Sequence, residues 1–266
     1  MSKFQEAISQ IEELNNLNKR DQWVNQIHPL VKLSVAIVYI AVVVSFSKYM
    51  LEGLLAMAIY PIFVFNVGDL SFKDALYRLK IILPLVMVVG ILNPFFDRQI
   101  VVYIGEVGVS GGVLSMLSLM IKGVYTVLAA YLLVATTSVE EICYALKLIH
   151  VPTSVVTVVL LIYRYLFMLF KEAEKVTIAY KLRAPGQKGI NYKAWGPLVG
   201  QMLLRSMDRA KAIYEAMEIR GFSGEFHTTK KRGFDMTSLI YFVIWLVIFY
   251  MVRHTDILSV IGGLVL

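Results

Sequence analysis

The stretch Val113–Thr136 has the sequence VLSMLSLMIKGVYTVLAAYLLVAT and contains one charged residue, Lys122. Its length exceeds the roughly 20 apolar residues that a helix needs to cross a bilayer. Four further apolar runs approach that length, at about 31–46, 50–67, 81–94 and 236–251. Across the chain 58% of residues are hydrophobic and 17% are charged, against about half and a quarter in soluble domains. The sequence therefore predicts an all-α polytopic membrane protein with about five transmembrane helices.

The segments outside these runs differ from them in character. Residues 1–27 mix charges with apolar residues at helical spacing, which indicates an amphipathic cytoplasmic helix at the membrane surface rather than a signal peptide. A charged segment, 69–80, precedes the third run, which contains Pro84. Between the third and fourth runs, 100–112 combines short β-branched stretches with glycines, which predicts a small hairpin outside the membrane.

Two long helices are expected between the last two runs. The first extends from Pro152 to Arg183, and the second from about Tyr192 to Arg220. Five residues of the second helix, spaced alternately by four and three, form a narrow apolar seam: Leu203, Met207, Ala210, Tyr214 and Met217. We expect this seam to pack along the other long helix. An ordinary core-facing stripe is the alternative, and both interpretations imply a protein partner rather than lipid.

The distribution of positive charge predicts the topology. Residues 171–233 hold thirteen of the 26 lysine and arginine residues, and such segments stay on the cytoplasmic side. A six-span alternative, in which 155–170 also crosses, would place them outside and is disfavoured. The expected organisation has four parts. A cytoplasmic N-terminal segment covers 1–27, and four transmembrane helices cover 28–136. A cytoplasmic region with the two long helices covers 137–233, and a last transmembrane helix with a tail covers 234–266.

The sequence offers little chemistry for catalysis. It contains no phosphate-binding GxxxxGK[ST] loop and no HExxH or CxxC motif. The four histidines, His28, His150, His227 and His254, are scattered, so no metal site is expected. We attribute the net charge of +7 to cytoplasmic lysine and arginine rather than to nucleic-acid binding. Lys122, inside a predicted span, is either a functional charge or a side chain that extends to the interface.

An arginine stands at the end of each long helix. Ala179-Tyr180-Lys181-Leu182-Arg183-Ala184 ends the first, and Ala216-Met217-Glu218-Ile219-Arg220-Gly221 ends the second. Ordinary capping explains either arginine alone, because a basic residue in the last turn opposes the helix dipole. Two similar sites on successive helices favour a second hypothesis, in which each arginine binds a carboxylate of a docked partner.

In these motifs the chain resembles the transmembrane T component of energy-coupling factor (ECF) transporters, most closely the cobalt-transport type. The resemblance covers nearly the whole chain, and its last two motifs are the most specific. It rests on His28-Pro29-x-x-Lys32-Leu33, Asn93-Pro94 to Gly112, Thr136-Thr137 to Leu146 with Pro152, Tyr163-Arg164-Tyr165-Leu166-Phe167 with Glu172-Ala173-Glu174, Arg205-Ser206-x-x-Arg209, and Ala216-Met217-Glu218-Ile219-Arg220-Gly221.

The resemblance implies a scaffold of a bacterial or archaeal plasma membrane rather than an enzyme. Such a scaffold joins two cytoplasmic ATP-binding cassette ATPases to a substrate-binding membrane S component. ATP and Mg²⁺ are used by the ATPases, and the scaffold itself binds no cofactor. By motif position Arg183 and Arg220 would insert into grooves of the ATPases, with Ala179, Ala216 and Gly221 completing the motifs. Ala184 stands where the family usually has glycine, so the first cap departs from the pattern.

Cobalt or nickel is the substrate that this subgroup implies. A vitamin-type or group-shared T component is the nearest alternative. An autonomous secondary transporter or channel would transport without ATP and usually contain internal repeats, which we do not recognise in the sequence. A membrane-embedded enzyme would need a polar catalytic constellation at membrane depth, and the sequence offers none.

Overall fold

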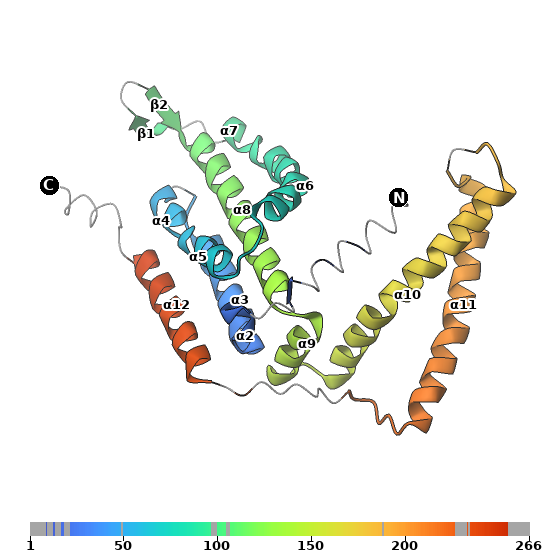
Figure 1. Cartoon of the computed structure of the whole chain (residues 1–266). Coiled ribbons are helices and arrows are strands. Elements are labelled where there is room, and N and C mark those ends of the chain that lie inside the picture. Colours follow the sequence, from blue (N-terminus) through green and yellow to red (C-terminus); the bar gives the residue numbers. More distant parts are fainter. Residues whose placement is uncertain are drawn as a thin grey trace. The chain divides into compact units, whose positions relative to one another are not determined.

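The computed structural model describes residues 22–48, 50–96, 100–104, 107–187, 189–226 and 235–254, together with Ser9, Glu13, Leu17, Asn18 and Gly233. Most of these residues are helical (Figure 1). The chain divides into two compact units. The membrane unit comprises Leu17–Ser138 and Arg232–Leu266, and the long-helix unit comprises Val139–Lys231 and Met1–Asn16. The polypeptide therefore passes between the units after Asn16, after Ser138 and after Lys231.

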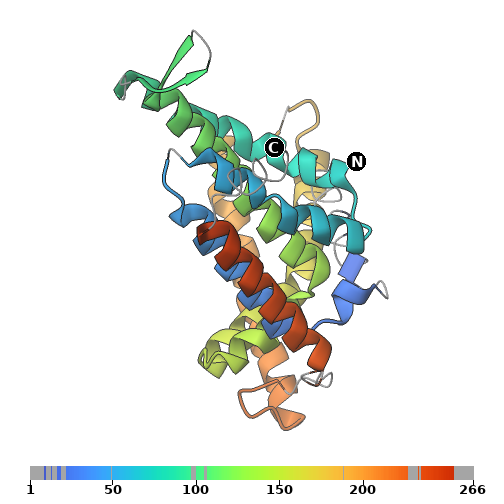
Figure 2. The same cartoon turned by 90° about the vertical axis from the view of Figure 1, so that its left-hand side faces the viewer.

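The membrane unit is built around its longest helix, α8. Its elements are α2 (Trp23–Gln26), α3 (Pro29–Ser45), α4 (Leu51–Ala56), α5 (Ile59–Val67), α6 (Phe72–Gly90), α7 (Asn93–Phe96), β1 (Ile100–Ile104), β2 (Val107–Ser110), α8 (Gly111–Thr136) and α12 (Met236–His254). Helix α8 contacts α3, α4, α5, α6 and α7. Figure 2 shows α12, the last helix in the sequence, alongside α3, which α12 contacts.

Aromatic side chains hold α12 to the helices near the start of the chain. Tyr39 of α3 and Tyr60 of α5 are buried with ring centroids 4.6 Å apart. Trp245 of α12 meets Tyr60 edge-on at 4.9 Å, and Phe249 lies 5.5 Å from Tyr39. Such pairs contribute about 0.5–1.5 kcal/mol each beyond the area that they bury. The core of the unit therefore joins helices that are far apart in the sequence.

The second predicted span is two helices rather than one, because α4 ends at Ala56 and α5 begins at Ile59. Pro61 has no N–H to donate to the carbonyl four residues earlier, that of Met57. The Tyr39 hydroxyl donates to this carbonyl instead, at 3.0 Å. The proline thus interrupts the helix, and the tertiary structure satisfies the carbonyl that it leaves free.

The third predicted span also has different bounds in the structure. Helix α6 (Phe72–Gly90) includes most of the charged segment expected to precede the span, and it contains Pro84. The change from charged to apolar residues near position 80 therefore does not mark the start of a helix. Lysine, arginine and leucine all favour helical structure. The helix therefore continues across this position, while its side chains change from charged to apolar. The predicted hairpin is confirmed, with β1 and β2 antiparallel and Ile104 opposite Val107.

The long-helix unit contains α9 (Val139–Leu148), α10 (Thr153–Arg183) and α11 (Tyr192–Ile219). The two long helices were predicted with nearly these bounds, whereas α9 was not predicted. Helices α10 and α11 run antiparallel beside each other (Figure 1). His150 has a φ of 64° and ends α9, because the N–H of Val151 then bonds to the carbonyl of Leu146 at 3.2 Å.

Three helices within the described ranges are long and apolar enough to cross a membrane: α8, α10 and α12. The shorter apolar stretches Pro29–Ser45 and Leu51–Val67 accompany them. Their outward side chains are exposed, for example Ile37, Val44 and Ile244, as expected where lipid rather than protein surrounds a helix. An all-α polytopic membrane protein is therefore confirmed. Helix length alone permits α10 to cross, so charge distribution is what distinguishes five spans from six.

Candidate coupling site

The end of α11 forms a complete glycine cap around Arg220. Gly221 has a φ of +81°, which favours glycine. The N–H of Phe222 bonds to the carbonyl of Met217 at 3.0 Å, and the N–H of Gly221 bonds to that of Glu218 at 2.9 Å. This pair of bonds is the Schellman motif, which satisfies the carbonyls of the last turn. Arg220 therefore sits on a helix end whose backbone is satisfied without its side chain.

The end of α10 is capped differently, as the replacement of glycine by Ala184 led us to expect. Ala184 has a φ of −126°, and its N–H bonds to the carbonyl of Tyr180 at 3.0 Å. The Tyr180 hydroxyl donates to Gln187 Oε1 at 2.7 Å and accepts from the backbone N–H of Asn191 at 3.2 Å. Tyr180 thus fixes the turn from α10 to α11, and Arg183 lies in the last turn before it.

Both arginines are exposed, and neither guanidinium forms a hydrogen bond or ion pair with another residue that the structure describes. Ala179 and Ala216, one turn before each arginine, are also exposed and small. Capping therefore explains the backbone at each tip but leaves each positive charge available to a partner. The structure does not bring the two tips together. Because α10 and α11 are antiparallel, the length of α11, 28 residues, separates the tips by about 40 Å.

A hollow of about 250 Å³ opens between α10 and α11 beside Arg183. Its walls include three cationic side chains, Lys175, Arg183 and Arg205, and one carboxylate, Glu172. Arg205 Nη1 donates to Glu172 Oε1 at 3.0 Å and so links the two helices. Positive charge is in excess around this hollow, which suits a carboxylate of a docked protein.

The apolar seam of α11 does not lie against α10, and the prediction that it would do so is wrong. Leu203, Met207 and Tyr214 are 61%, 51% and 55% exposed, and Ala210 is exposed too, whereas Met217 is half-buried. Leu198, which lines the hollow between the helices, is half-buried. The face of α11 toward α10 instead carries Leu198, Gln201 and Arg205, and Arg205 pairs with Glu172 of α10. The seam remains available to a protein or to lipid.

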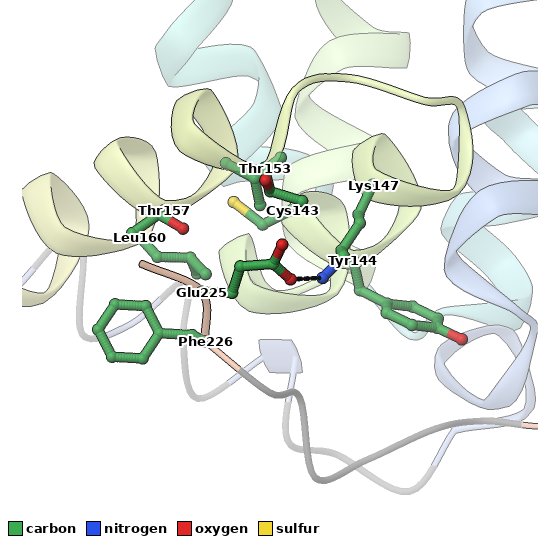
Figure 3. A pocket seen from close by; sticks show the side chains of 9 residues that line it. Cys143, Tyr144, Lys147, Thr153, Thr157, Leu160, Glu225 and Phe226 are labelled. Carbon is green, nitrogen blue, oxygen red and sulfur yellow. Dashed lines mark hydrogen bonds and ion pairs between the residues drawn. The ribbon is translucent and has the colours of Figure 1, made fainter. Parts of the chain in front are cut away.

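The chain that follows Arg220 returns to α9 and α10 (Figure 3). Lys147 Nζ donates to Glu225 Oε2 at 2.7 Å, and Thr157 Oγ1 donates to the carbonyl of Gly224 at 3.1 Å. The rings of Phe222 and Phe226 lie 5.0 Å apart. This contact was not predicted from the sequence, because α9 was not predicted. A signal for the start of α9 was present, since Ser138-Val139-Glu140-Glu141 has the spacing of a capping box.

Cys143 lies in the wall of this contact and is 1% exposed. Burial raises the pKa of its thiol, and the negative charge of Glu140 raises this pKa further. The side chain packs as a small apolar residue, and a thiol with a raised pKa is a poor nucleophile and metal ligand at neutral pH. In the described part of the chain, no group of three or more His, Cys, Asp and Glu side chains could hold a metal ion.

Two lysines of the membrane unit cap helix ends. Lys32 Nζ, near the start of α3, donates to the carbonyl of Thr136 at 2.7 Å, where α8 ends. Lys122 Nζ, in α8, donates to the carbonyls of Phe46 at 2.6 Å and Val44 at 3.2 Å, where α3 ends. A cation is favoured at the carboxyl end of a helix. Lys122 therefore satisfies carbonyls at the end of α3, a role that its position in the sequence did not suggest.

Comparison with known proteins identifies the family of the chain. The family described as cobalt transport protein, CbiQ, matches residues 20–231, which include both arginine motifs and the long-helix pair. The chain belongs to this family.

Three relatives illustrate the range of the family. The chain is 26% identical to the energy-coupling factor transporter transmembrane protein EcfT of Leuconostoc gelidum subsp. gasicomitatum, over 88% of this chain and 94% of that protein. It is 30% identical to the nickel permease LarQ of Lactiplantibacillus plantarum over 45% of each chain. It is 26% identical to the cobalt transport protein CbiQ of Rhodobacter capsulatus, over 38% of this chain and 41% of that protein. The expected resemblance to an ECF T component of the cobalt type is thereby confirmed.

Proposed function

We propose that this T component couples two cytoplasmic ATPases to a substrate-binding membrane subunit. The observation that carries the proposal is the pair of exposed arginines, Arg183 and Arg220, at opposite ends of one antiparallel helix pair. Two similar sites about 40 Å apart suit two similar ATPase subunits, one at each tip. Closure of the ATPases would pull on the two ends of this helix pair and so move the long helices. The chain then transmits force and catalyses no reaction of its own.

The rest of the surface supports the same role. The exposed apolar seam of α11 offers a contact for the substrate-binding subunit, since exposed apolar stripes of this kind favour protein interaction. The thirteen lysine and arginine residues of 171–233 favour a cytoplasmic side for the long-helix unit and, by the count of spans, for the N terminus, where ATP and Mg²⁺ are available to the ATPases.

Cobalt or nickel is the substrate class that we propose. The family description names cobalt, and two of the relatives are named for cobalt and nickel. A vitamin-type or shared T component is the second candidate, because the relative named EcfT, whose name specifies no metal, is similar over a much larger share of both chains than the metal-named relatives are.

The coupling role is tested by substitution at the two tips. Arg183→Ala and Arg220→Ala should each weaken ATPase docking, since removing one partner of a buried charge pair costs about 2–5 kcal/mol. The measurement is the amount of ATPase that follows the tagged chain out of native membranes in mild detergent. Lys211→Ala is the control, because it removes an exposed positive charge from the same helix away from the tip and outside the quoted motifs. Unchanged ATPase recovery in the double variant would contradict the arginine assignment.

The substrate is tested in cells that lack their own copy of the gene. Expression of the chain with its partners should raise the cell content of cobalt or nickel, measured by elemental analysis at trace external metal. The Arg183→Ala, Arg220→Ala double variant should not raise it. An unchanged metal content alongside normal ATPase recovery would favour the vitamin-type alternative, and the mass spectrum of the co-purified small subunit would identify the class.

A further inference from the structure

The start of α3 is bonded to two other helices of the membrane unit. The backbone N–H of His28, the N-cap residue, donates to Ser238 Oγ in the first turn of α12 at 3.0 Å. One turn later, Lys32 Nζ donates to the carbonyl of Thr136, the last residue of α8, at 2.7 Å. His28 and Lys32 are each 4% exposed, and Ser238 is 3% exposed. We call these four residues the clasp: His28, Lys32, Thr136 and Ser238.

A lysine this deeply buried is rare and costly unless it is well bonded. Lys32 lies at the carboxyl end of α8, where unpaired carbonyls and the helix dipole both favour a cation. A methionine or leucine would fill similar space without that cost. The ammonium group is therefore best explained by the carbonyl that it holds.

In the sequence, the clasp residues are close to the positions where the chain passes between the two units. Thr136 comes two residues before the passage after Ser138, and Ser238 comes six residues after Arg232, where the chain re-enters the membrane unit. The third passage follows Asn16, and the carbonyl of Leu17 accepts from Asn25 Nδ2, three residues before His28, at 3.2 Å. One short segment, 25–32, thus forms hydrogen bonds to three residues, each of which is close in the sequence to one of the passages.

We propose that the clasp is the fixed pivot of this T component, and that Lys32 is its positioning residue. The proposal rests on the coupling function proposed above. Movement of the long helices reaches the membrane unit through the chain passages. The clasp holds the last residue of α8 and the first turn of α12 against the start of α3. The three helices therefore move together rather than independently. Without Lys32, ATP hydrolysis would continue but would move the membrane unit less.

Lys122 provides a matched control. It makes the same kind of lysine-to-carbonyl bond between the same two helices, but at the end of α3 that is remote from Thr136. Lys32→Met and Lys122→Met therefore both delete lysine-to-carbonyl bonds between α3 and α8, one buried bond in the first case and two less buried bonds in the second. Only the first deletes a bond beside a chain passage.

The test measures hydrogen–deuterium exchange in the whole complex, purified with its ATPases in mild detergent. In Lys32→Met, amides of 137–142 and of 236–242 should both exchange about tenfold faster, the effect of losing one hydrogen bond to a charged donor. Lys122→Met should speed exchange near 44–48 only. After reconstitution of the same complexes into sealed lipid vesicles, metal uptake per ATP hydrolysed should fall in Lys32→Met and stay near that of the unaltered chain in Lys122→Met.

Three outcomes would overturn the pivot: faster exchange at 137–142 without any change at 236–242, equal effects of the two lysine variants at the passages, or an unchanged uptake per ATP in Lys32→Met. Should Lys32→Met fail to assemble, Ser238→Ala removes only a hydroxyl and should still speed exchange at 137–142. Unchanged exchange there would refute the clasp. Failure of the coupling function itself is distinguished by the loss of any co-purified ATPase.

Discussion

At the scale of the residue, the tip of α11 depends on one backbone angle. Gly221 has a φ of +81°, and a Cβ added there would meet no atom within 4 Å. Gly221→Ala should therefore act through backbone strain alone, about 1–2 kcal/mol, and should displace Arg220. We expect ATPase recovery to fall several-fold, measured by co-purification.

Gly200→Ala is the control for this substitution. It adds the same methyl group inside α11, also with no atom within 4 Å. There it should stabilise the helix by about 0.8–1 kcal/mol, because alanine favours helices more than glycine does. Equal losses of ATPase recovery from both variants would show that the capping geometry at Arg220 is unimportant.

Cys143 is the single cysteine of the chain and so reports on the contact between α9, α10 and the segment after Arg220. Burial and Glu140 raise the pKa of its thiol. Because the thiolate is the reactive form, maleimide labelling of the native protein should be slow at neutral pH. It should accelerate as the pH rises toward the raised pKa. Labelling as fast as that of a denatured sample at neutral pH would contradict the burial of this thiol.

At the scale of the element, the break between α4 and α5 is a proline effect that another helix compensates. Tyr39→Phe leaves the Met57 carbonyl without the hydroxyl that it binds at 3.0 Å, and an unsatisfied buried carbonyl costs about 1–3 kcal/mol. Pro61→Ala restores a backbone N–H that can bond to this carbonyl within the helix. We expect Tyr39→Phe to lower the thermal midpoint in detergent, and addition of Pro61→Ala to recover part of it.

The single variant Pro61→Ala completes this double-mutant cycle. The two substitutions share one carbonyl, so their effects should not add. Strict additivity would mean that Tyr39 stabilises the unit only by packing.

Sequence reasoning succeeded best with the long helices and least with the short ones. Pro152 and Ala184-Pro185-Gly186 bracket α10 in the sequence, and the helix occupies Thr153–Arg183. By contrast α9 has only 10 residues, and a capping box is the main signal for it in the sequence. The seam of α11 was correctly seen as apolar but assigned to the wrong neighbour. Periodicity shows that a face is apolar, whereas the choice of neighbour depends on contacts such as Arg205–Glu172.

At the scale of the whole molecule, the orientation in the membrane stays a prediction from charge. In a Cys143→Ser background, Lys48→Cys should react with a membrane-impermeant maleimide on intact cells, because the turn after α3 is expected outside. Lys193→Cys, at the start of α11, should react only after permeabilisation. Reaction of both cysteines on intact cells would support the six-span alternative, in which α10 also crosses the membrane and the turn after α3 stays outside.

The membrane class, the hairpin, the two long helices and the arginines at the helix ends could all be predicted from the sequence. These follow from local properties: apolar run length, turn-forming residues, and proline or glycine next to a helix end. Three features became visible only in the folded molecule: Arg183 and Arg220 lie at opposite ends of one helix pair, the seam is exposed, and Lys32 binds the end of α8. The physical reason is that a hydrogen bond spanning 104 residues depends on how helices pack, and no local pattern in the sequence encodes that choice.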